Sequence, residues 1–318
     1  MLKLISLVTP CYNSTAFISR LYESILMQEG VKIEWVLVDD CSSDKTIDLI
    51  KTFKSTELIN IKIYKLNTNS GGGGAIAKGV EHSTGDIIMI IDHDDELCEK
   101  ALKNIYEDWH CVSDDDAGIT YRRVDPIKNK IIGSELTYGM RFTSSWQKNT
   151  KPDITDMNFA IKSEVMKKYI HSESMRNITM MGVIWNRMSK SYKFMVGNQS
   201  GFIKYHRDNS DSQTLSVKIS WKTVYTYAKY LDLYDKYYLF NTKYWIKHIL
   251  NLISFSILVH GKPLYSFKYL ESNFIKSILF FMTPLGYLKY KFVNVNNIRV
   301  YKHCENEDEV IYKTTRLK

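Results

Sequence analysis

The sequence predicts an α/β protein whose mostly parallel, Rossmann-like central sheet has helices on both faces, followed by a C-terminal helical region. Short apolar runs alternate with helical patterns through the first hundred residues, which is typical of βαβ units. The runs at 35–38 and 87–91 contain no polar residue, as expected of strands covered on both faces. From about residue 216 the pattern becomes helical and rich in Tyr, Lys, Leu and Ile.

Each element of the first hundred residues follows from a local signal. Pro10 ends the first strand, and Ser14 or Thr15 can cap the next segment, whose apolar residues share one helical face. A run of glycines at 71–74 leads into the third helix. We therefore expect strands at 4–8, 35–38, 61–66 and 86–91, and helices at 16–28, 44–53 and 75–82.

The pattern between residues 100 and 215 is mixed. We expect helices near 101–109, 162–169 and 183–191, and strands near 118–123, 192–196 and 201–205. A soft boundary near residue 215 divides the chain into a domain at 1–215 and a helical, aromatic and basic region at 216–318.

The composition limits the class of protein. With 44% hydrophobic and 25% charged residues, the 318-residue chain is not expected to be disordered. A net charge of +8 indicates an anionic partner, without choosing among nucleic acid, a membrane surface and a phosphorylated substrate. The five cysteines form no C-x-x-C pair and the N-terminal apolar segment is too short for a signal peptide, so we expect a cytoplasmic location.

The segment Asp92-His93-Asp94 is the strongest chemical signal. Its two carboxylates follow a buried strand, and ligands of open α/β sheets bind beyond the carboxyl ends of strands. Carboxylate oxygens suit Mg²⁺ or Mn²⁺, ions that bridge a few carboxylates to substrate phosphates. The alternative is a solvated acidic turn that caps the next helix.

Three further segments follow strands or precede a helix. The turn at 9–13 offers polar groups and the ring of Tyr12 to a base or ribose, although an ordinary turn has the same composition. Asp40 can accept a hydrogen bond from a base, whereas its neighbours can simply cap a helix. The glycines that follow Asn69 suit a phosphate-bearing ligand near a helix N-terminus, with Lys78 as a further contact, or else form a flexible linker.

The order and spacing of these segments resemble the N-terminal region of family 2 glycosyltransferases with the GT-A fold, of the bacterial surface-polysaccharide type. The chain reads VTPCYN at 8–13, VDDCSSDKT at 38–46, NSG at 69–71 and GDIIMIIDHDD at 85–95. The resemblance is strong over about 1–100 and loose over 101–215. It implies that these two parts are a nucleotide-sugar half and an acceptor half.

The resemblance also implies roles for individual residues. Pro10, Tyr12 and Asp40 would line the nucleobase pocket, with uracil the commonest base in the family. Asp92 would contact the ribose or the water shell of the metal, and Asp94 would bind the metal. The implied nucleotide-sugar site is Thr9, Pro10, Tyr12, Asp40, Asn69, Gly71, Lys78, Asp92, His93 and Arg207. The implied Mn²⁺ or Mg²⁺ ligands are Asp92, Asp94 and His206, and an exposed histidine is the alternative for His206.

One position departs from the family pattern. Inverting members use an Asp or Glu as the general base that takes the proton from the acceptor hydroxyl. Met181 stands at the matching position here, and a thioether cannot act as a base. Either the alignment is shifted, or catalysis is impaired, or another carboxylate takes the role. Asp153, Asp156 and Glu173 are the candidates, with Asp156 and Glu173 nearest in sequence.

The C-terminal region allows two interpretations. Its longest apolar stretch, 249–259, is shorter than the ~20 residues that span a bilayer. Lysines beside aromatic and aliphatic residues at 274–292 suit a helix that lies in a membrane interface. Equally, the region can pack on the catalytic domain or on a second subunit of a homo-oligomer.

We therefore expect a glycosyltransferase that moves a hexosyl or N-acetylhexosaminyl group from a UDP-sugar, with a divalent metal and inversion, to a glycan or lipid-linked acceptor. It would be cytoplasmic or peripheral on the inner face of the membrane. The alternatives are a donor-binding protein with weak or no catalysis, a nucleotidyltransferase and a nucleic-acid-binding module. The nucleotidyltransferase loop and nucleic-acid-binding motifs are absent from the sequence, and an acidic cluster would repel phosphate unless a metal intervenes.

Overall fold

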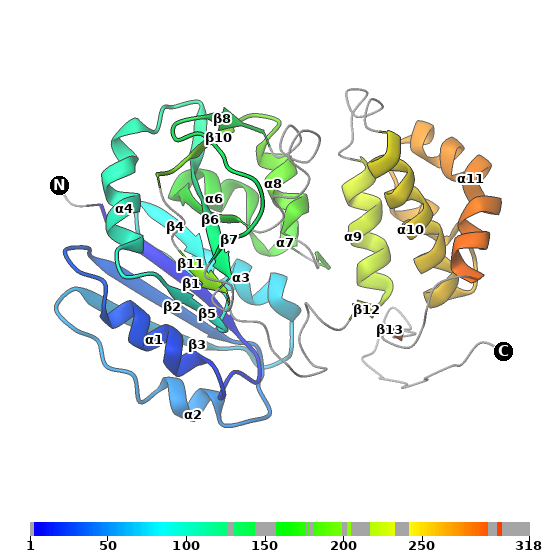
Figure 1. Ribbon diagram of the computed structural model, residues 1–318. Helices are drawn as coiled ribbons and strands as arrows, with labels where there is room; N and C mark the ends of the chain where they lie inside the picture. Colours follow the sequence, from blue (N-terminus) through cyan, green and yellow to red (C-terminus); the bar gives the residue numbers. More distant parts are fainter. Residues whose placement is uncertain are drawn as a thin grey trace. The chain divides into compact units, whose positions relative to one another are not determined.

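The computed structural model describes residues 3–125, 130–143, 157–175, 177–178, 181–198, 202–204, 217–232, 242–291 and 298–300 (Figure 1). The chain divides into two compact units. The first consists of Met1–Arg176 and Ile184–Tyr205, and the second of Asn177–Val183 and His206–Lys318.

A mostly parallel sheet forms the centre of the first unit. Its N-terminal half has the strand order β3-β2-β1-β4, all parallel, with β1 (Ile5–Cys11), β2 (Ile33–Asp39), β3 (Ile59–Lys65) and β4 (Ile87–Ile90). The sheet continues through β9 (Met157–Lys162), β6 (Asp116–Asp125), β10 (Lys193–Val196) and β8 (Arg141–Phe142). Three short strands pair beside this path: β5 (Asp95–Leu97), β7 (Lys130–Ile131) and β11 (Phe202–Lys204).

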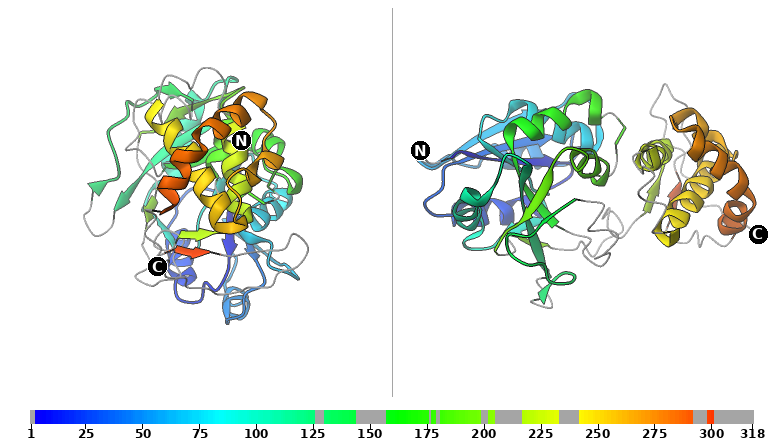
Figure 2. Two further views of the ribbon diagram at one scale, coloured as in Figure 1. Left: turned by 90° about the vertical axis from the view of Figure 1, so that its right-hand side faces the viewer. Right: turned by 90° about the horizontal axis from the view of Figure 1, so that it is seen from above.

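Helices cover both faces of this sheet, as the right-hand view of Figure 2 shows. The apolar faces of α1 (Ile18–Leu26), α2 (Thr46–Ile50) and α4 (Ala101–Asp108) join the core on the side of Leu7 and Trp35. On the other side, α3 (Gly71–His82) packs on β1 and β2, and α6 (Ser163–Tyr169) packs beside α3. The predicted α/β class is therefore confirmed.

The second unit is helical. Its core lies among α9 (Trp221–Asp232), α10 (Thr242–His260), α11 (Asn273–Lys291) and the short 3-10 helix η3 (Tyr265–Tyr269). Two three-residue strands, β12 (Val217–Ile219) and β13 (Ile298–Val300), form a parallel pair. No helix in the described part of the chain is both long enough and apolar enough to cross a membrane.

Some predicted elements differ from the observed ones. The glycines at 71–74 are not a loop before a helix, because α3 already begins at Gly71, which has a φ of +75°. The strands β5 and β9 were not predicted, since neither segment has the alternating or continuous apolar pattern of a strand. Both are instead specified by long-range pairing, β9 between β4 and β6 and β5 with β11. The predicted helices at 16–28 and 44–53 are shorter, at Ile18–Leu26 and Thr46–Ile50.

Candidate functional site

Three turns leave the sheet at the same edge. The last residues of β1 and β2 are paired, with Cys11 opposite Asp39. β4 lies on the other side of β1, and Ile91 still donates a backbone hydrogen bond to Val8. The chain segments after Cys11, Asp39 and Ile91 therefore emerge next to one another, as expected for a ligand site at the carboxyl ends of parallel strands.

The turns after β1 and β2 are joined by hydrogen bonds. The amide of Asp40 donates to the carbonyl of Cys11 at 2.8 Å. The amide of Asn13 donates to Ser42 Oγ, and the amide of Ser43 donates back to Asn13 Oδ1, both at 3.0 Å. Asn13 and Cys41 have φ angles of 49° and 60°, a region that L-residues enter at a cost of about 1–3 kcal/mol. These bonds hold the turns in one conformation despite that cost.

Asp40 is buried, with 3% of its surface exposed. Its Oδ1 accepts hydrogen bonds from the amide of Ser70 at 2.6 Å and from the hydroxyl of Ser70 at 2.8 Å. Asn69 donates to the carbonyl of Asp40 at 3.1 Å. The second carboxylate oxygen, Oδ2, has no partner among the described residues. Asp40 thus has one oxygen fixed by the start of α3 and one available to a donor group.

The start of α3 lies beside this carboxylate. Asn69 Oδ1 accepts a hydrogen bond from the amide of Gly71 at 3.1 Å. Because Ser70 Oγ donates to Asp40, it does not cap the helix. The first turn therefore presents glycine backbone without side chains, as a ligand needs for close approach. Lys78, farther along α3, is partly exposed and pairs with Glu81 of the same helix at 3.2 Å.

The acidic turn after β4 is closed by a hydrogen bond from the amide of Asp95 to the carbonyl of Asp92 at 3.0 Å. The side chains of Asp92, His93 and Asp94 are all partly exposed. His93 Nδ1 lies 3.2 Å from the carbonyl oxygen of Pro10, so as a donor it ties this turn to the one after β1. Arg20 of α1 donates to the carbonyl of Asp94 at 2.9 Å, which fixes the backbone directly after Asp94.

A buried charge cluster supports the acidic turn from behind. Asp95 is fully buried, and its Oδ1 accepts a hydrogen bond from Arg123 Nη1 at 3.0 Å. Arg123 Nη2 lies 2.7 Å from Asp95 Oδ2, an ion pair without hydrogen-bond geometry. The same guanidinium donates to Asn158 Oδ1 from Nε at 3.0 Å and from Nη2 at 2.7 Å. Arg123 of β6 and Asn158 of β9 thus hold the end of the turn, and neither was predicted, because each is unremarkable in the local sequence.

The residues predicted at the end of β1 have different environments. Thr9 is fully buried, and its hydroxyl accepts a hydrogen bond from Trp35 Nε1 at 3.0 Å, so its side chain belongs to the core. Pro10 is partly exposed and Tyr12 is 45% exposed, so both can contact a ligand at the sheet edge. Burial, and then the charge of Asp39, raises the pKa of the Cys11 thiol, which makes this cysteine a poor nucleophile.

Several predicted residues lie outside the described ones. These are Asp153, Asp156, His206 and Arg207, and nothing is described of the side chain of Glu173. The strand that leads toward His206 is described: β11 pairs antiparallel with β5, with Lys204 opposite Asp95. Met181 is partly exposed and precedes α8 (Gly182–Met188).

The donor set of the acidic turn fits a hard divalent cation only in part. In the described part of the chain, no three His, Cys, Asp or Glu side chains gather as a metal site. Two partly exposed carboxylates, Asp92 and Asp94, remain at the turn. That set suits an ion such as Mg²⁺ or Mn²⁺, which keeps several waters and takes further ligands from substrate phosphates.

Comparison with known proteins gives a family and a fold. The model of the family described as "Glycosyl transferase family 2" matches residues 6–170. Over 159 residues the chain is 30% identical to the poly(ribitol-phosphate) beta-N-acetylglucosaminyltransferase TarS of Staphylococcus aureus, a match over 49% of this chain and 25% of the relative. The matched part thus spans about a quarter of that curated relative.

Two solved structures have a similar fold. TarS 1-349 of Staphylococcus aureus in complex with UDP-GlcNAc is similar with a TM-score of 0.54 and 16% identity, over 91% of this chain and 90% of that one. The mannosyltransferase PcManGT of Pyrobaculum calidifontis, in complex with GDP-Man and Mn²⁺, is similar with a TM-score of 0.53 and 14% identity, over 92% and 83%. At these identities the likeness concerns the fold alone.

Proposed function

Because the chain belongs to glycosyl transferase family 2, we propose that it moves a sugar from a UDP-sugar to a glycan or lipid-linked acceptor with the help of Mn²⁺ or Mg²⁺. The observation that carries this proposal is the convergence of three turns at one sheet edge. Asp40, held by Ser70, follows β2, and the Asp92–Asp94 turn, tied to Pro10 through His93, follows β4, so the two acidic turns flank the end of β1.

The nucleoside would bind at the ends of β1 and β2. The exposed ring of Tyr12 offers an apolar face on which a base can stack. Asp40 Oδ2 can accept a hydrogen bond from a base N–H, since its other oxygen is already fixed by Ser70. A carboxylate acceptor suits the N3–H of uracil, and a similar fold carries UDP-GlcNAc. Both points favour a uridine donor.

The diphosphate would bind near the acidic turn. Asp94, with Asp92, would hold the metal, which neutralises charge on the departing nucleotide diphosphate. A similar fold carries GDP-Man together with Mn²⁺, which supports a metal-assisted transfer. The residues around the turn keep it in place, because Arg20 and the Arg123–Asp95 pair bind its backbone and its end. His206 and Arg207 are proposed as further contacts to the metal and the diphosphate.

Inversion at the sugar would need a general base for the acceptor hydroxyl. Met181 cannot supply one, so Asp156 and Glu173 are the proposed candidates. If neither acts, the chain binds the donor with weak or no catalysis, and the methionine is the observation that favours this second function. The transferred group is proposed as a hexosyl or N-acetylhexosaminyl unit, the latter in line with the activity for which TarS is named.

The acceptor is proposed to be a glycan or a lipid-linked glycan on the inner face of the membrane. TarS is named as an enzyme of poly(ribitol phosphate), an anionic polymer. A chain with a net charge of +8 would attract such an acceptor at long range. A cytoplasmic protein with peripheral membrane contact would meet both kinds of acceptor.

The test is donor binding and turnover with one carboxylate removed. The melting temperature of the wild-type chain should rise with UDP-GlcNAc or UDP-glucose only when Mn²⁺ is present, because a ligand of the native state stabilises it. Asp94→Asn should weaken metal-dependent donor binding by about tenfold or more, the loss of about 1.4 kcal/mol. Asp48→Asn, which removes an exposed carboxylate from α2, is the matched control and should bind as the wild type does.

Turnover separates the two candidate functions. Hydrolysis of the UDP-sugar without acceptor should be metal-dependent in the wild type and strongly reduced in Asp94→Ala. Undiminished metal-dependent turnover in that variant would overturn the proposed role of the acidic turn. If the wild type binds the donor but shows no turnover, and Asp156→Asn and Glu173→Gln bind the donor as tightly as the wild type, the chain is a donor-binding protein.

A further inference from the structure

The solvent-facing side of α11 is mainly apolar, with Asn273, Ser277 and Lys291 as its exposed polar residues. Successive residues of an α-helix are rotated by about 100°, and the exposed residues of α11 fall within an arc of roughly 160°. The apolar residues of this arc are Phe274 at 55%, Phe280 at 59%, Phe281 at 78%, Leu285 at 54%, Tyr287 at 47% and Leu288 at 51% exposed, together with Pro284. A surface helix normally presents polar residues to water, so this apolar face, which we call the α11 face, needs an explanation.

The neighbouring helix shows that packing does not explain the α11 face. α10 is the more apolar of the two in sequence, yet its residues Ile249, Leu252 and Ile253 are fully buried in the core of the second unit. α11 already contributes Ile275 and Leu279 to that core from its opposite side. The core is therefore complete without the α11 face, and the apolar stretch at 249–259 is accounted for by packing.

The charged residues within α11 all have one sign, and the acidic Glu271 just before the helix is paired with Lys229. α11 contains Lys276, Lys289 and Lys291, and no Asp or Glu. Lys289 donates a hydrogen bond to Asn251 Oδ1 of α10 at 2.6 Å. Burial, and then the charge of the neighbouring Lys247, lowers the pKa of Lys289. Two ammonium groups near each other at the margin of an apolar surface would be stabilised by an anion placed between them.

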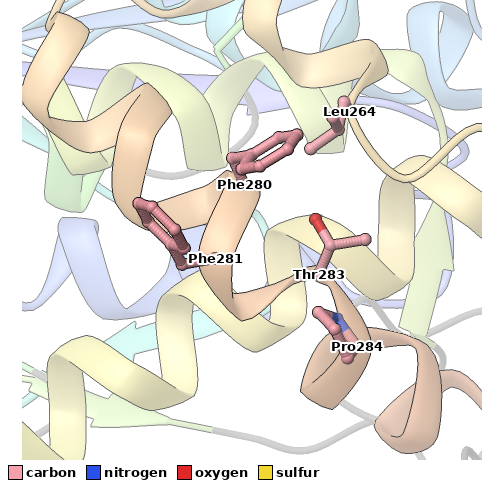
Figure 3. A pocket seen from close by; sticks show the side chains of 5 residues that line it. All are labelled: Leu264, Phe280, Phe281, Thr283 and Pro284. Carbon is pink, nitrogen blue, oxygen red and sulfur yellow. The ribbon is translucent and has the colours of Figure 1, made fainter.

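The α11 face also has a hollow near the middle of the helix. Leu264 lies opposite Phe280 and Phe281, with Thr283 and Pro284 completing the lining (Figure 3). The ring of Phe280 extends toward Leu264 (Figure 3). An apolar hollow of this kind suits part of an acyl chain or another flexible hydrocarbon group.

We propose that the α11 face lies on a membrane surface that contains anionic lipids, with the aromatic and aliphatic side chains at the level of the acyl chains and the lysines at the phosphates. Charge complementarity favours this occupant, because a basic rim attracts anionic headgroups whereas two copies of the same basic face repel each other. None of the described helices can cross a bilayer, so the contact is interfacial. The proposal does not depend on sugar transfer.

Vesicle binding of the full chain tests this directly. The wild-type chain should sediment with vesicles of phosphatidylcholine containing about 30% phosphatidylglycerol and far less with phosphatidylcholine alone. Raising the salt from about 0.1 M to about 0.5 M should weaken binding, because it screens the lysines. The double variant Phe281→Ser/Leu285→Ser should bind at least about tenfold more weakly, since two large apolar side chains no longer leave water.

Two controls keep the result interpretable. Met27→Ser removes an apolar side chain that is 66% exposed in the first unit, and it should leave vesicle binding unchanged. The substitutions at 281 and 285 lie on the surface, so the unfolding midpoint and the donor-induced thermal shift should both match the wild type. Unaltered vesicle binding by the double variant, or no binding by the wild type, would overturn the proposal. If the wild type and Met27→Ser form a concentration-dependent dimer and the double variant does not, the α11 face binds a second copy of the chain instead.

Discussion

Replacing Arg123 by methionine should destabilise the first unit more than any surface change of similar size. The guanidinium is the shared partner of Asp95 and Asn158, and Asp95 has no exposed surface. Methionine keeps much of the volume but leaves the carboxylate of Asp95 buried without its cation. Removing one partner of a buried ion pair costs about 3–5 kcal/mol. That is a large part of the roughly 5–15 kcal/mol by which a domain is usually stable.

Urea unfolding followed by tryptophan fluorescence measures this loss, and a double-mutant cycle with Asp95→Asn isolates the pair. Lys103→Met is the matched control, because Lys103 forms an exposed pair with Glu107 at 3.9 Å and should cost less than about 1 kcal/mol. Arg123→Met should also weaken metal-dependent donor binding, since the turn at 92–95 loses its support. A loss below about 1 kcal/mol, or a coupling energy near zero, would refute the assigned role of the cluster.

Two further predictions concern the sheet. Burial acts to raise the pKa of Glu34, but hydrogen bonds from Lys62 and from two hydroxyl side chains outweigh it and lower the pKa from 4.5 to about 2. The ionised carboxylate should therefore stabilise the fold by up to about 3 kcal/mol above pH 4.5, a contribution lost as the pH falls toward 2. In Glu34→Gln, the free energy of unfolding measured in urea should depend less on pH over this range. The same pH dependence as in the wild type would contradict the assignment. Gly79→Ala should cost about 1–3 kcal/mol, because its Cβ would lie 2.4 Å from Val8 Cγ1, whereas Gly72→Ala, with open space around it, should cost less. Equal urea midpoints of unfolding for the two glycine variants would show that α3 can shift away from β1 without loss of stability.

The α/β architecture could be predicted because its signals are local. The core strands around Trp35 and Met89 are continuous apolar runs, and α1 carries Ile18, Leu21 and Ile25 on one face. Helix ends were predicted less accurately: α1 ends at Leu26, because Met27 is the C-cap residue and the amide of Gln28 hydrogen-bonds only three residues back, to Ile25. The strands β5 and β9 could not be predicted, because their pairing partners lie far away in the sequence.

The candidate site could be predicted from the sequence to about the same extent as the fold. Spacing placed Asp40 and Asp92 at strand ends, and the structure brings those ends to one edge of the sheet. The burial of Thr9 could not be anticipated, because the hydroxyl that looks available in sequence is bound by Trp35 from the neighbouring strand. Arg123 and Asn158 were also missed, since their role depends on a long-range contact with Asp95.

The pairing of β5 with β11 has a consequence for the order of folding. The strands β1 to β4 pair with one another within the first ninety residues, so this part of the sheet can begin to form while the rest of the chain is still being synthesised, although β4 gains its second partner, β9, only later. The strand that follows the acidic turn pairs with residues 202–204, and its charge partner Arg123 also comes later. The ends of β1 and β2 can thus take shape early, whereas the acidic turn becomes fixed only once two-thirds of the chain has emerged.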